Sequence, residues 1–360
     1  GIVLDPNKRA TVYLRLEDKA GNVSYLNANG YILDQSKSVI EFTGLNPAPA
    51  SAPADPEDPT VYGSDAKDGI TVSLKVQEGA DTESGIKTIT ASITGGAKIK
   101  TDGETSDTSD TLTLYASDIT DETNPDTVKE SDLKDTWTGN VIIDTTGVDS
   151  SDVVLTITTV DHAGNETSAS KKFDIDTVGP AITLTYNNNA AKVRDDKYYF
   201  NAARTATITI EESHFDAAAA TAAIAIKAVD AAGDPVVIAS IDGTAWINDG
   251  NTHTLIYSFS QDANYTLTIA DTYKDLRGNK HSGVIYPEGT KAGKTFTVDT
   301  KAPTGNVTVK ESLTNSLLTA LTFGAFHKEA VEVAATGSDT TSPFTLYTYK
   351  QGPEARELDA

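Results

Sequence analysis

Apolar and polar residues alternate along much of this chain, and alternation with a period of two predicts β-strands. The pattern is clear over residues 11–17, 153–157 and 265–269, where a large apolar residue or tyrosine occupies every second position. Such strands place one face on a core and the other in water, as the strands of an antiparallel sandwich do. The expected fold class is therefore all-β.

A five-residue phrase, Asp-x-x-Gly-Asn, follows each of these three strands. It occupies residues 18–22, 161–165 and 275–279. Each copy leads into a further short strand, and these closing strands end on Asp34, Asp176 and Asp299, respectively. The copies recur at domain-sized intervals, since one domain has about 100–150 residues. Repetition of this kind predicts tandem modules.

The three closing aspartates divide the chain into four predicted segments. They are residues 1–34, the C-terminal part of one module; 35–176 and 177–299, two complete modules; and 300–360, the N-terminal part of a further module. The incomplete first and last segments lead us to expect a piece of a longer array.

The proline-rich run 46–59 has the composition of an interdomain linker. Internal alignment of the modules, however, places a first strand before it (39–42) and a second strand after it (70–74), like the strands at 181–184 and 206–210. We therefore interpret the run as a loop inside one module.

Two further features concern the interior of the modules. The alanine-rich stretch 216–223 predicts a short helix, because alanine has the highest helix propensity. Trp137 and Trp246 lie at similar places in the two complete modules, and we interpret them as core residues rather than as a platform for stacking sugars.

The net charge of −23 disfavours two classes of partner. A polyanion repels nucleic acid and anionic membrane surfaces, but it stays soluble and attracts cations. No apolar run approaches the roughly 20 residues that span a bilayer, so we expect no direct membrane insertion. Cysteine and methionine are both absent, which suits an exposed, secreted protein that must not cross-link or oxidise.

Several of these residues together resemble a known group of domains. The phrase Asp-x-Ala-Gly-Asn and the closing strand before Asp-Thr-x-x-Pro are similar to bacterial immunoglobulin-like repeat domains of large cell-surface, adhesin-type proteins. The second complete module adds residues 208–216, Trp246, His253 and 262–265, which resemble one subgroup of these repeats. Two departures exist: the first junction, 34–37, lacks the proline, and the last phrase contains Leu276 and Arg277.

The resemblance implies tandem immunoglobulin-like antiparallel β-sandwiches arranged end to end. It also implies an extracellular location, at a cell surface or in a cell wall, with neighbouring modules of the same polypeptide as partners. Some surface domains of this kind contain a Lys–Asn isopeptide bond, but the sequence assigns no such pair here.

The repeated phrase has two interpretations. The first is turn chemistry alone, because Asp and Asn side chains accept or donate hydrogen bonds locally and Gly tolerates positive φ. The second is a calcium site at each module junction, because carboxylate and amide oxygens are the ligands that Ca²⁺ takes. We expect Asp161, Asn165, Asp174 and Asp176 to converge at one junction and Asp275, Asn279 and Asp299 to be the counterparts at the next. The acidic stretch 101–132 also attracts cations, but a solvated loop is the simpler interpretation.

No combination of residues indicates an enzyme. The chain has no cysteine nucleophile, no Gly-x-Ser-x-Gly elbow and no phosphate-binding glycine loop. The five histidines are scattered without paired spacing: His162, His214, His253, His281 and His327.

The leading hypothesis is a structural stalk that carries a distal functional domain away from a cell surface. The alternative is an adhesin-type binding module that recognises a glycan or protein through the variable loops 95–135 and 186–197, because binding residues concentrate in loops. Candidate aromatic residues for such a site are Tyr186, Tyr198 and Tyr199. A further alternative is a component of a virion or a surface layer.

Overall fold

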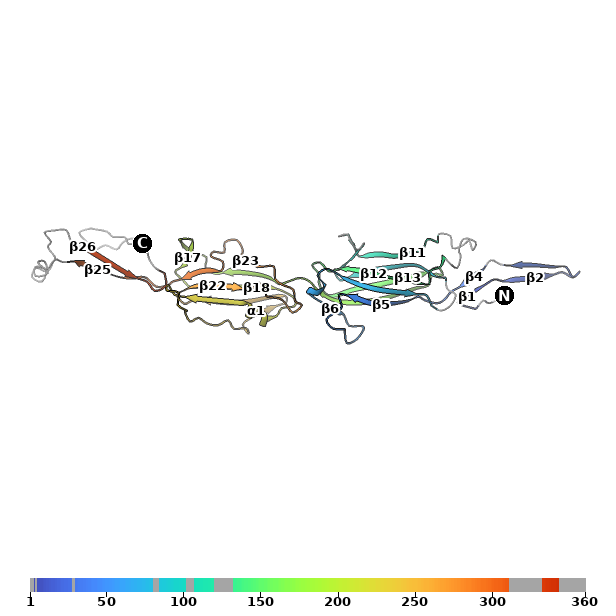
Figure 1. Cartoon of the computed structure of the whole chain (residues 1–360), viewed down its shortest axis with the longest axis horizontal. Helices are drawn as coiled ribbons and strands as arrows, with labels where there is room; N and C mark the ends of the chain where they lie inside the picture. Colours follow the sequence, from blue (N-terminus) through green and yellow to red (C-terminus); the bar gives the residue numbers. More distant parts are fainter. Residues whose placement is uncertain are drawn as a thin grey trace, which may run out of the picture. The chain divides into compact units, whose positions relative to one another are not determined.

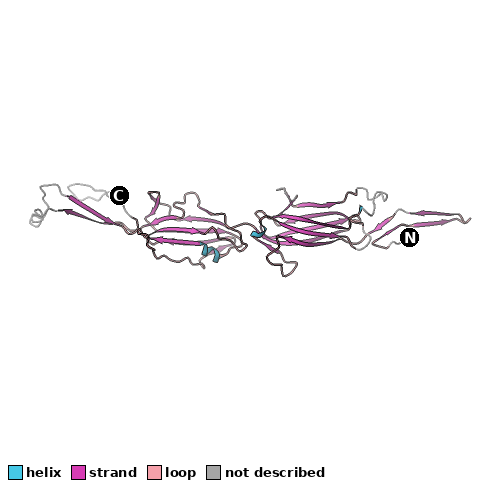
Figure 2. Ribbon diagram, viewed as in Figure 1, coloured by secondary structure: helices cyan, strands magenta, loops and turns pink. Residues whose placement is uncertain are grey.

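The computed structural model describes residues 3, 5–27, 30–79, 84–101, 107–119, 132–310 and 332–342. The chain divides into two compact units (Figure 1). The first unit comprises residues 1–179 together with 276–279, and the second comprises residues 180–275 and 280–360. Strands account for nearly all regular structure in the described residues, and helical segments are few and short (Figure 2).

Residues 8–33 of the first unit form two small antiparallel ladders. β1 (Lys8–Ala10) pairs with β4 (Tyr31–Leu33), and β2 (Tyr13–Glu17) pairs with β3 (Val23–Asn27). Every side chain of β2 and β3 is exposed. The alternation thus predicted a strand here correctly, but the expected buried face is absent from the described structure, because a two-stranded ribbon has no second layer to cover it.

The first sandwich consists of two five-stranded sheets with the orders β10-β9-β12-β7-β5 and β11-β8-β13-β14-β6. Its elements are β5 (Val39–Asn46), β6 (Thr60–Tyr62), the 3₁₀ turn η1 (Ser64–Ala66), β7 (Ile70–Gln77), β8 (Ile86–Thr94), β9 (Lys98–Lys100), β10 (Thr108–Ser109), β11 (Thr111–Ala116), β12 (Thr136–Asp144), β13 (Asp149–Asp161) and β14 (Glu166–Asp176). The described pairs are antiparallel except that of β6 with β14, which is parallel. The proline-rich run lies between β5 and β6, which belong to the two sheets of this sandwich.

Alternation accounts for the core of the first sandwich. Strand β7 buries Ile70 and every second residue after it, and β13 buries Val153, Leu155 and Ile157 in the same way. The two faces meet in one apolar cluster that also contains Phe173. Trp137 packs against this cluster only partly buried.

The second sandwich repeats this architecture with the orders β20-β21-β18-β15-β23 and β16-β17-β24-β22-β19. Its elements are β15 (Ala181–Tyr186), β16 (Lys192–Arg194), β17 (Lys197–Phe200), β18 (Arg204–Glu211), α1 (Ala217–Ala223), β19 (Ile224–Val229), β20 (Ile247–Asp249), β21 (Thr252–Phe259), β22 (Ala263–Ile269), β23 (Val284–Ile285) and β24 (Thr295–Val298). Two short pairs, β15 with β23 and β17 with β24, are parallel. Beyond this sandwich, β25 (Thr304–Lys310) pairs with β26 (Glu332–Ser338).

The predicted helix and core tryptophan of the second sandwich are both confirmed. Helix α1 begins after Asp216, whose carboxylate accepts hydrogen bonds from the backbone N–H groups of Ala218 and Ala219 and so caps the helix. Trp246 is buried in the second core, and its indole N–H donates to Thr221 Oγ1 at 2.9 Å.

Both sandwiches are immunoglobulin-like, with two packed and mainly antiparallel sheets, so the predicted fold class is confirmed. The helices in the described part of the chain are all too short to cross a membrane.

Candidate functional site

The second copy of the repeated phrase forms the turn between β13 and β14. Asn165 donates two hydrogen bonds to Asp161: its backbone N–H to Oδ1 at 2.8 Å and its side-chain amide to Oδ2 at 2.7 Å. Gly164 has a φ of 89°, a backbone conformation that favours glycine. The phrase is therefore a local turn in which each polar residue has a geometric role.

The first copy forms the same turn between β2 and β3. Asn22 donates to Asp18 from its backbone N–H at 2.9 Å and from its side-chain amide at 2.7 Å, and Gly21 has a φ of 87°. This copy is exposed. Its turn hydrogen bonds also lower the pKa of Asp18, with the Asn22 amide as the largest cause. Turn chemistry thus accounts for the first two copies of the phrase, so an ion site needs additional residues.

Two further acids join Asp161 inside the first unit. Asp34, immediately after β4, and Glu78, immediately after β7, each place a carboxylate oxygen so that the three oxygens lie within 4.8 Å of one another. All three residues are buried, with Asp161 fully so. We call Asp34, Glu78 and Asp161 the carboxylate cluster.

Neighbouring polar groups orient the carboxylate cluster. Ser84 donates from its backbone N–H at 2.8 Å and from its hydroxyl at 2.9 Å to Asp34 Oδ2. Ser38 donates from its hydroxyl to Glu78 Oε1. The Asn165 amide also donates to the backbone oxygen of Asp34 at 3.1 Å. These bonds fix where the carboxylate oxygens point, and they connect residues 34–38 to the sandwich.

The charges of the carboxylate cluster require compensation. Two unit charges separated by 4.8 Å repel by about 3.5 kcal/mol at an effective dielectric constant of about 20. No lysine or arginine forms an ion pair with Asp34 or Asp161 among the residues that the structure describes. Oxygens that share one Ca²⁺ at about 2.3–2.6 Å lie no more than about 5 Å apart, so the spacing and the all-oxygen donor set fit that ion.

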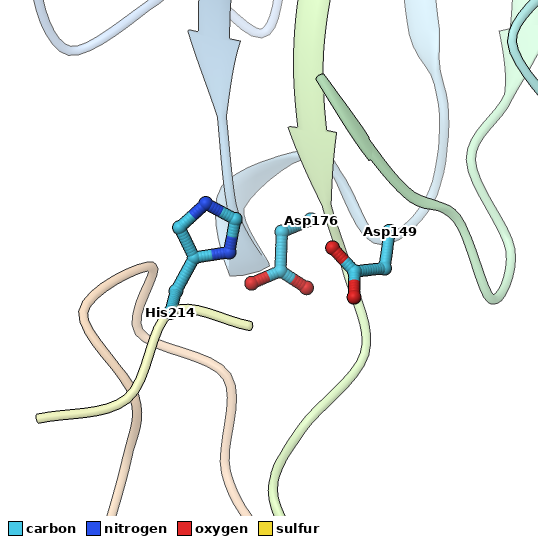
Figure 3. Close-up of side chains that lie close together, drawn as sticks. All are labelled: Asp149, Asp176 and His214. Carbon is cyan, nitrogen blue, oxygen red and sulfur yellow. The ribbon is translucent and has the colours of Figure 1, made fainter. Parts of the chain in front are cut away.

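The expected convergence of Asp174 and Asp176 with Asp161 is wrong. In the ladder between β13 and β14, Asp176 pairs with Asp149, whereas Val160, next to Asp161, pairs with Glu166. Asp161, at the end of β13, and Asp176, at the end of β14, therefore lie at opposite ends of the β13–β14 ladder, roughly 30 Å apart at about 3.3 Å per residue. Figure 3 shows the carboxylates of Asp149 and Asp176 at that far end.

Asp174 has a different partner from the one expected. Its Oδ2 forms an ion pair with the guanidinium of Arg277, and both side chains are largely buried. Arg277 belongs to the segment 276–279, which is part of the first unit. The backbone oxygen of Arg277 also accepts a hydrogen bond from the backbone N–H of Ser64. Asp174 is thus neutralised by a side chain.

The remaining predicted ligands have these positions. Asn279 donates from its amide to the backbone oxygen of Asp176 at 2.9 Å, which repeats the bond from Asn165 to Asp34. Asp299 accepts from the Ser342 hydroxyl and, at 3.2 Å, from the Lys301 backbone N–H. Asp275 belongs to the second unit.

Sequence reasoning missed Asp34 and Glu78 as members of the site. The sequence identifies Asp34 only as a module boundary. The available signal for Glu78 was its position directly after the strand β7, because Glu212 holds the same position directly after β18 in the second sandwich. The acids of 102–106 and 120–131 lie outside the described residues, so the acidic loop keeps both interpretations.

The tyrosines proposed for ligand binding do not form an exposed cluster. Tyr186 is buried and donates its hydroxyl to Gly293 O at 2.7 Å. Tyr198 and Tyr199 lie half-buried on β17. These described residues of the 186–197 region and its neighbouring strand serve the fold.

Comparison with known proteins finds similarity in structure only. No protein-family model matches the chain, and no curated protein matches it in sequence. Similar solved structures include a 1.5-MDa bacterial ice-binding adhesin (14% identity, covering 82% of this chain and 76% of that one, TM-score 0.23). Another is a tetra-tandem repeat from the extending region of a large adhesion protein (14% identity, 92% and 64% covered, TM-score 0.26).

A third similar structure is a Ca²⁺-stabilised adhesin with which an Antarctic bacterium reaches out and binds ice (16% identity, 84% of this chain and 59% of that one covered, TM-score 0.20). The chain spans less than two thirds of the length of the second and third structures. All three similarities have low sequence identity and a low TM-score.

Proposed function

We propose that this chain is a stalk segment of a large bacterial surface or secreted protein, in which calcium stiffens the module junctions. The observation that carries the proposal is the carboxylate cluster, because it brings the boundary residue Asp34 together with Glu78 and Asp161 of the following sandwich. Three carboxylate oxygens within 4.8 Å of one another match the hard-oxygen donor set that a divalent cation such as Ca²⁺ takes.

Calcium at this position would supply charge neutralisation and a rigid connection. Asp34 ends residues 1–34, whereas Glu78 and Asp161 follow or end strands of both sheets of the first sandwich. An ion that binds all three carboxylates would connect residues 1–34 to both sheets of the first sandwich, whereas hydrogen bonds within an exposed turn connect only neighbouring residues. Serine hydroxyls and backbone oxygens near the cluster can complete the six to eight ligands that Ca²⁺ takes.

We extend the proposal to the next boundary on sequence grounds. Asp176, Glu212 and Asp275 hold the same places in the repeat as Asp34, Glu78 and Asp161, and Asn279 corresponds to Asn165. Asp299 holds the place of Asp34 at the third boundary. Asp174, in contrast, is no longer proposed as a ligand, because Arg277 neutralises it.

The test is thermal unfolding and small-angle X-ray scattering with Ca²⁺, with Mg²⁺ and with a chelator. At a Ca²⁺ concentration of 100 times Kd, binding stabilises by about 2.7 kcal/mol, which raises Tm by about 5–10 °C. A stalk also requires a radius of gyration well above the roughly 21 Å of a compact chain of 360 residues. Equal Tm values in all three buffers would exclude the calcium junction, and a compact particle would exclude the stalk.

Matched variants connect the effect to the carboxylate cluster. Glu78→Gln and Asp161→Asn each remove one charge while keeping side-chain shape, and we expect both to abolish most of the Ca²⁺-dependent rise in Tm. Asp18→Asn makes the same change in a phrase of the same geometry that is exposed. This control should keep the full response to Ca²⁺.

The adhesin-type alternative remains a separate proposal about loops. A glycan or protein array probed with the chain tests it, and selective binding that survives chelation would favour recognition over a spacer role. The same array addresses the virion or surface-layer alternative, because a component of that kind should bind copies of its own assembly.

A further inference from the structure

Arg204, the first residue of β18, is completely buried in the second sandwich. Its guanidinium carbon lies 3.7 Å from the ring centre of Tyr186, 4.1 Å from that of Phe200 and 4.6 Å from that of Phe296. Cations are attracted to aromatic faces at these distances. Arg204 therefore occupies a cage built from three aromatic rings.

Hydrogen bonds attach the same guanidinium to two loops. Nε donates to Asn188 O at 2.8 Å, and Nη2 donates to Asn189 Oδ1 at 3.0 Å and to Lys291 O. Asn189 Oδ1 also accepts from the Lys291 backbone N–H at 3.0 Å. Arg204 and Asn189 thus fasten the loop after β15 to the loop before β24.

These two loops adjoin the first and the last strand of the second sandwich in chain order. Tyr186 is the last residue of β15, the first strand, and Phe296 lies in β24, the last strand. Phe200 ends β17, which runs parallel to β24 with Phe200 opposite Val298. Force applied to the two ends of this sandwich would separate β15 from the sheet starting at its first residue and β24 starting at its last residue. In both strands the separation then proceeds toward the residues that surround Arg204.

A buried arginine is a costly way to fill this space. Burial lowers the pKa of Arg204 to about 10, because desolvation disfavours the charged form. An apolar side chain of similar volume often serves a core as well or better. Only a planar donor with several N–H groups, however, can bind two loops and three rings at once.

We propose that Arg204 is a mechanical clamp that holds the first and last strands of the second sandwich together under tension. The proposal rests on the stalk function, in which load enters one end of each module and leaves at the other. It concerns residues of the second unit only and does not depend on calcium.

The test is force-clamp unfolding of the whole chain together with thermal melting. Arg204→Met keeps the volume and removes the charge and donors, whereas Arg204→Lys keeps the charge and removes the planar fork. We expect both variants to raise the unfolding rate of the second sandwich at a fixed force about tenfold or more, since three hydrogen bonds and the ring contacts contribute to the barrier. The two sandwiches differ in length, so their unfolding steps can be told apart.

Leu255→Ala is the matched control for lost stability. Leu255 is buried in the same core but lies on β21, which pairs with β18 and β20 and with neither terminal strand. It should lower Tm at least as much as Arg204→Lys while raising the forced unfolding rate less. The clamp would be overturned if the rise in forced unfolding rate were proportional to the loss in Tm in all three variants. It would also be overturned if Arg204→Met unfolded under force at the wild-type rate.

The two proposals fail separately. A compact particle in scattering excludes the stalk but leaves the forced unfolding rates measurable. An unchanged forced unfolding rate in an extended particle excludes the clamp and leaves the stalk intact. If Arg204→Met does not fold, circular dichroism will show it, and Arg204→Lys then decides alone.

Discussion

The side-chain amide of Asn165 donates a hydrogen bond to the backbone oxygen of Asp34 at 3.1 Å, across 131 residues of sequence. The same amide also closes its own turn on Asp161. Asn279 makes the equivalent bond to the oxygen of Asp176 at 2.9 Å. The repeated phrase and the closing aspartate therefore recur together for a physical reason: the asparagine of one repeat holds the boundary residue that precedes it.

This dual role predicts unequal effects of the same substitution in two copies of the phrase. Asn165→Ala removes two side-chain hydrogen bonds at a partly buried site, which should cost about 1–3 kcal/mol of unfolding free energy. Asn22→Ala removes one exposed bond and should cost less than about 1 kcal/mol. Urea denaturation in calcium-free buffer measures both, and equal losses would contradict a junction role for Asn165.

The two separate cores predict independent unfolding. Phe173 is buried in the first sandwich and Phe259 in the second, and no residue is common to the two clusters. Phe173→Ala and Phe259→Ala should each destabilise one sandwich by about 3–5 kcal/mol. In calorimetry, each variant should lower one of two transitions. A shift of both transitions by either variant would show that the sandwiches unfold as one cooperative unit.

Buried tyrosines predict loss of stability at alkaline pH. Burial is the largest cause that raises the pKa of Tyr62 to about 12, with the charge of Asp65 adding to it, and burial likewise raises that of Tyr265 to about 12. The folded state keeps these phenol protons at pH values where the unfolded state, with a pKa near 10, has lost them. The associated stabilisation is present below about pH 10 and disappears between about pH 10 and 12.

Phenolate absorbance measured against pH tests this for Tyr62. Tyr62→Phe should remove a late component of the titration in the folded protein while far-ultraviolet circular dichroism stays unchanged. It also removes the hydrogen bond from the Tyr62 hydroxyl to Pro47 O, so a small loss of stability at neutral pH is expected. If the late component were the same in the variant, Tyr62 would not be its source.

Two adjacent glycines predict a graded effect in the turn after β8. Gly95 and Gly96 both have positive φ, 81° and 89°. A Cβ on Gly95 would lie 2.4 Å from Asp152 O, whereas one on Gly96 would meet no atom within 4 Å. Gly96→Ala should therefore cost only the conformational strain, about 1–2 kcal/mol, and Gly95→Ala clearly more. Thermal melting that ranks the two variants in the opposite order would contradict this account.

Local features of this protein were predictable from its sequence because their causes are local. Period-two alternation and alignment of the repeats indicated several strands of both sandwiches, and the alanine run after Asp216 indicated α1. The turns of the first two copies of the phrase are closed by hydrogen bonds between residues four apart, so local sequence specifies them. Only at β2 and β3 did the pattern mislead, because alternation specifies which residues share a face and not whether another layer covers that face.

The candidate site depended on strand order and register, which alternation does not encode. Asp161 was expected beside Asp176, but antiparallel pairing places them at opposite ends of the β13–β14 ladder. Asp161 lies near Glu78 and Asp34 instead. The cage around Arg204 likewise joins strands that are distant in sequence. The sequence by itself determined the strands, the turns and the repeat. The packing of two sheets decided which acids meet, because those contacts are set by long-range pairing.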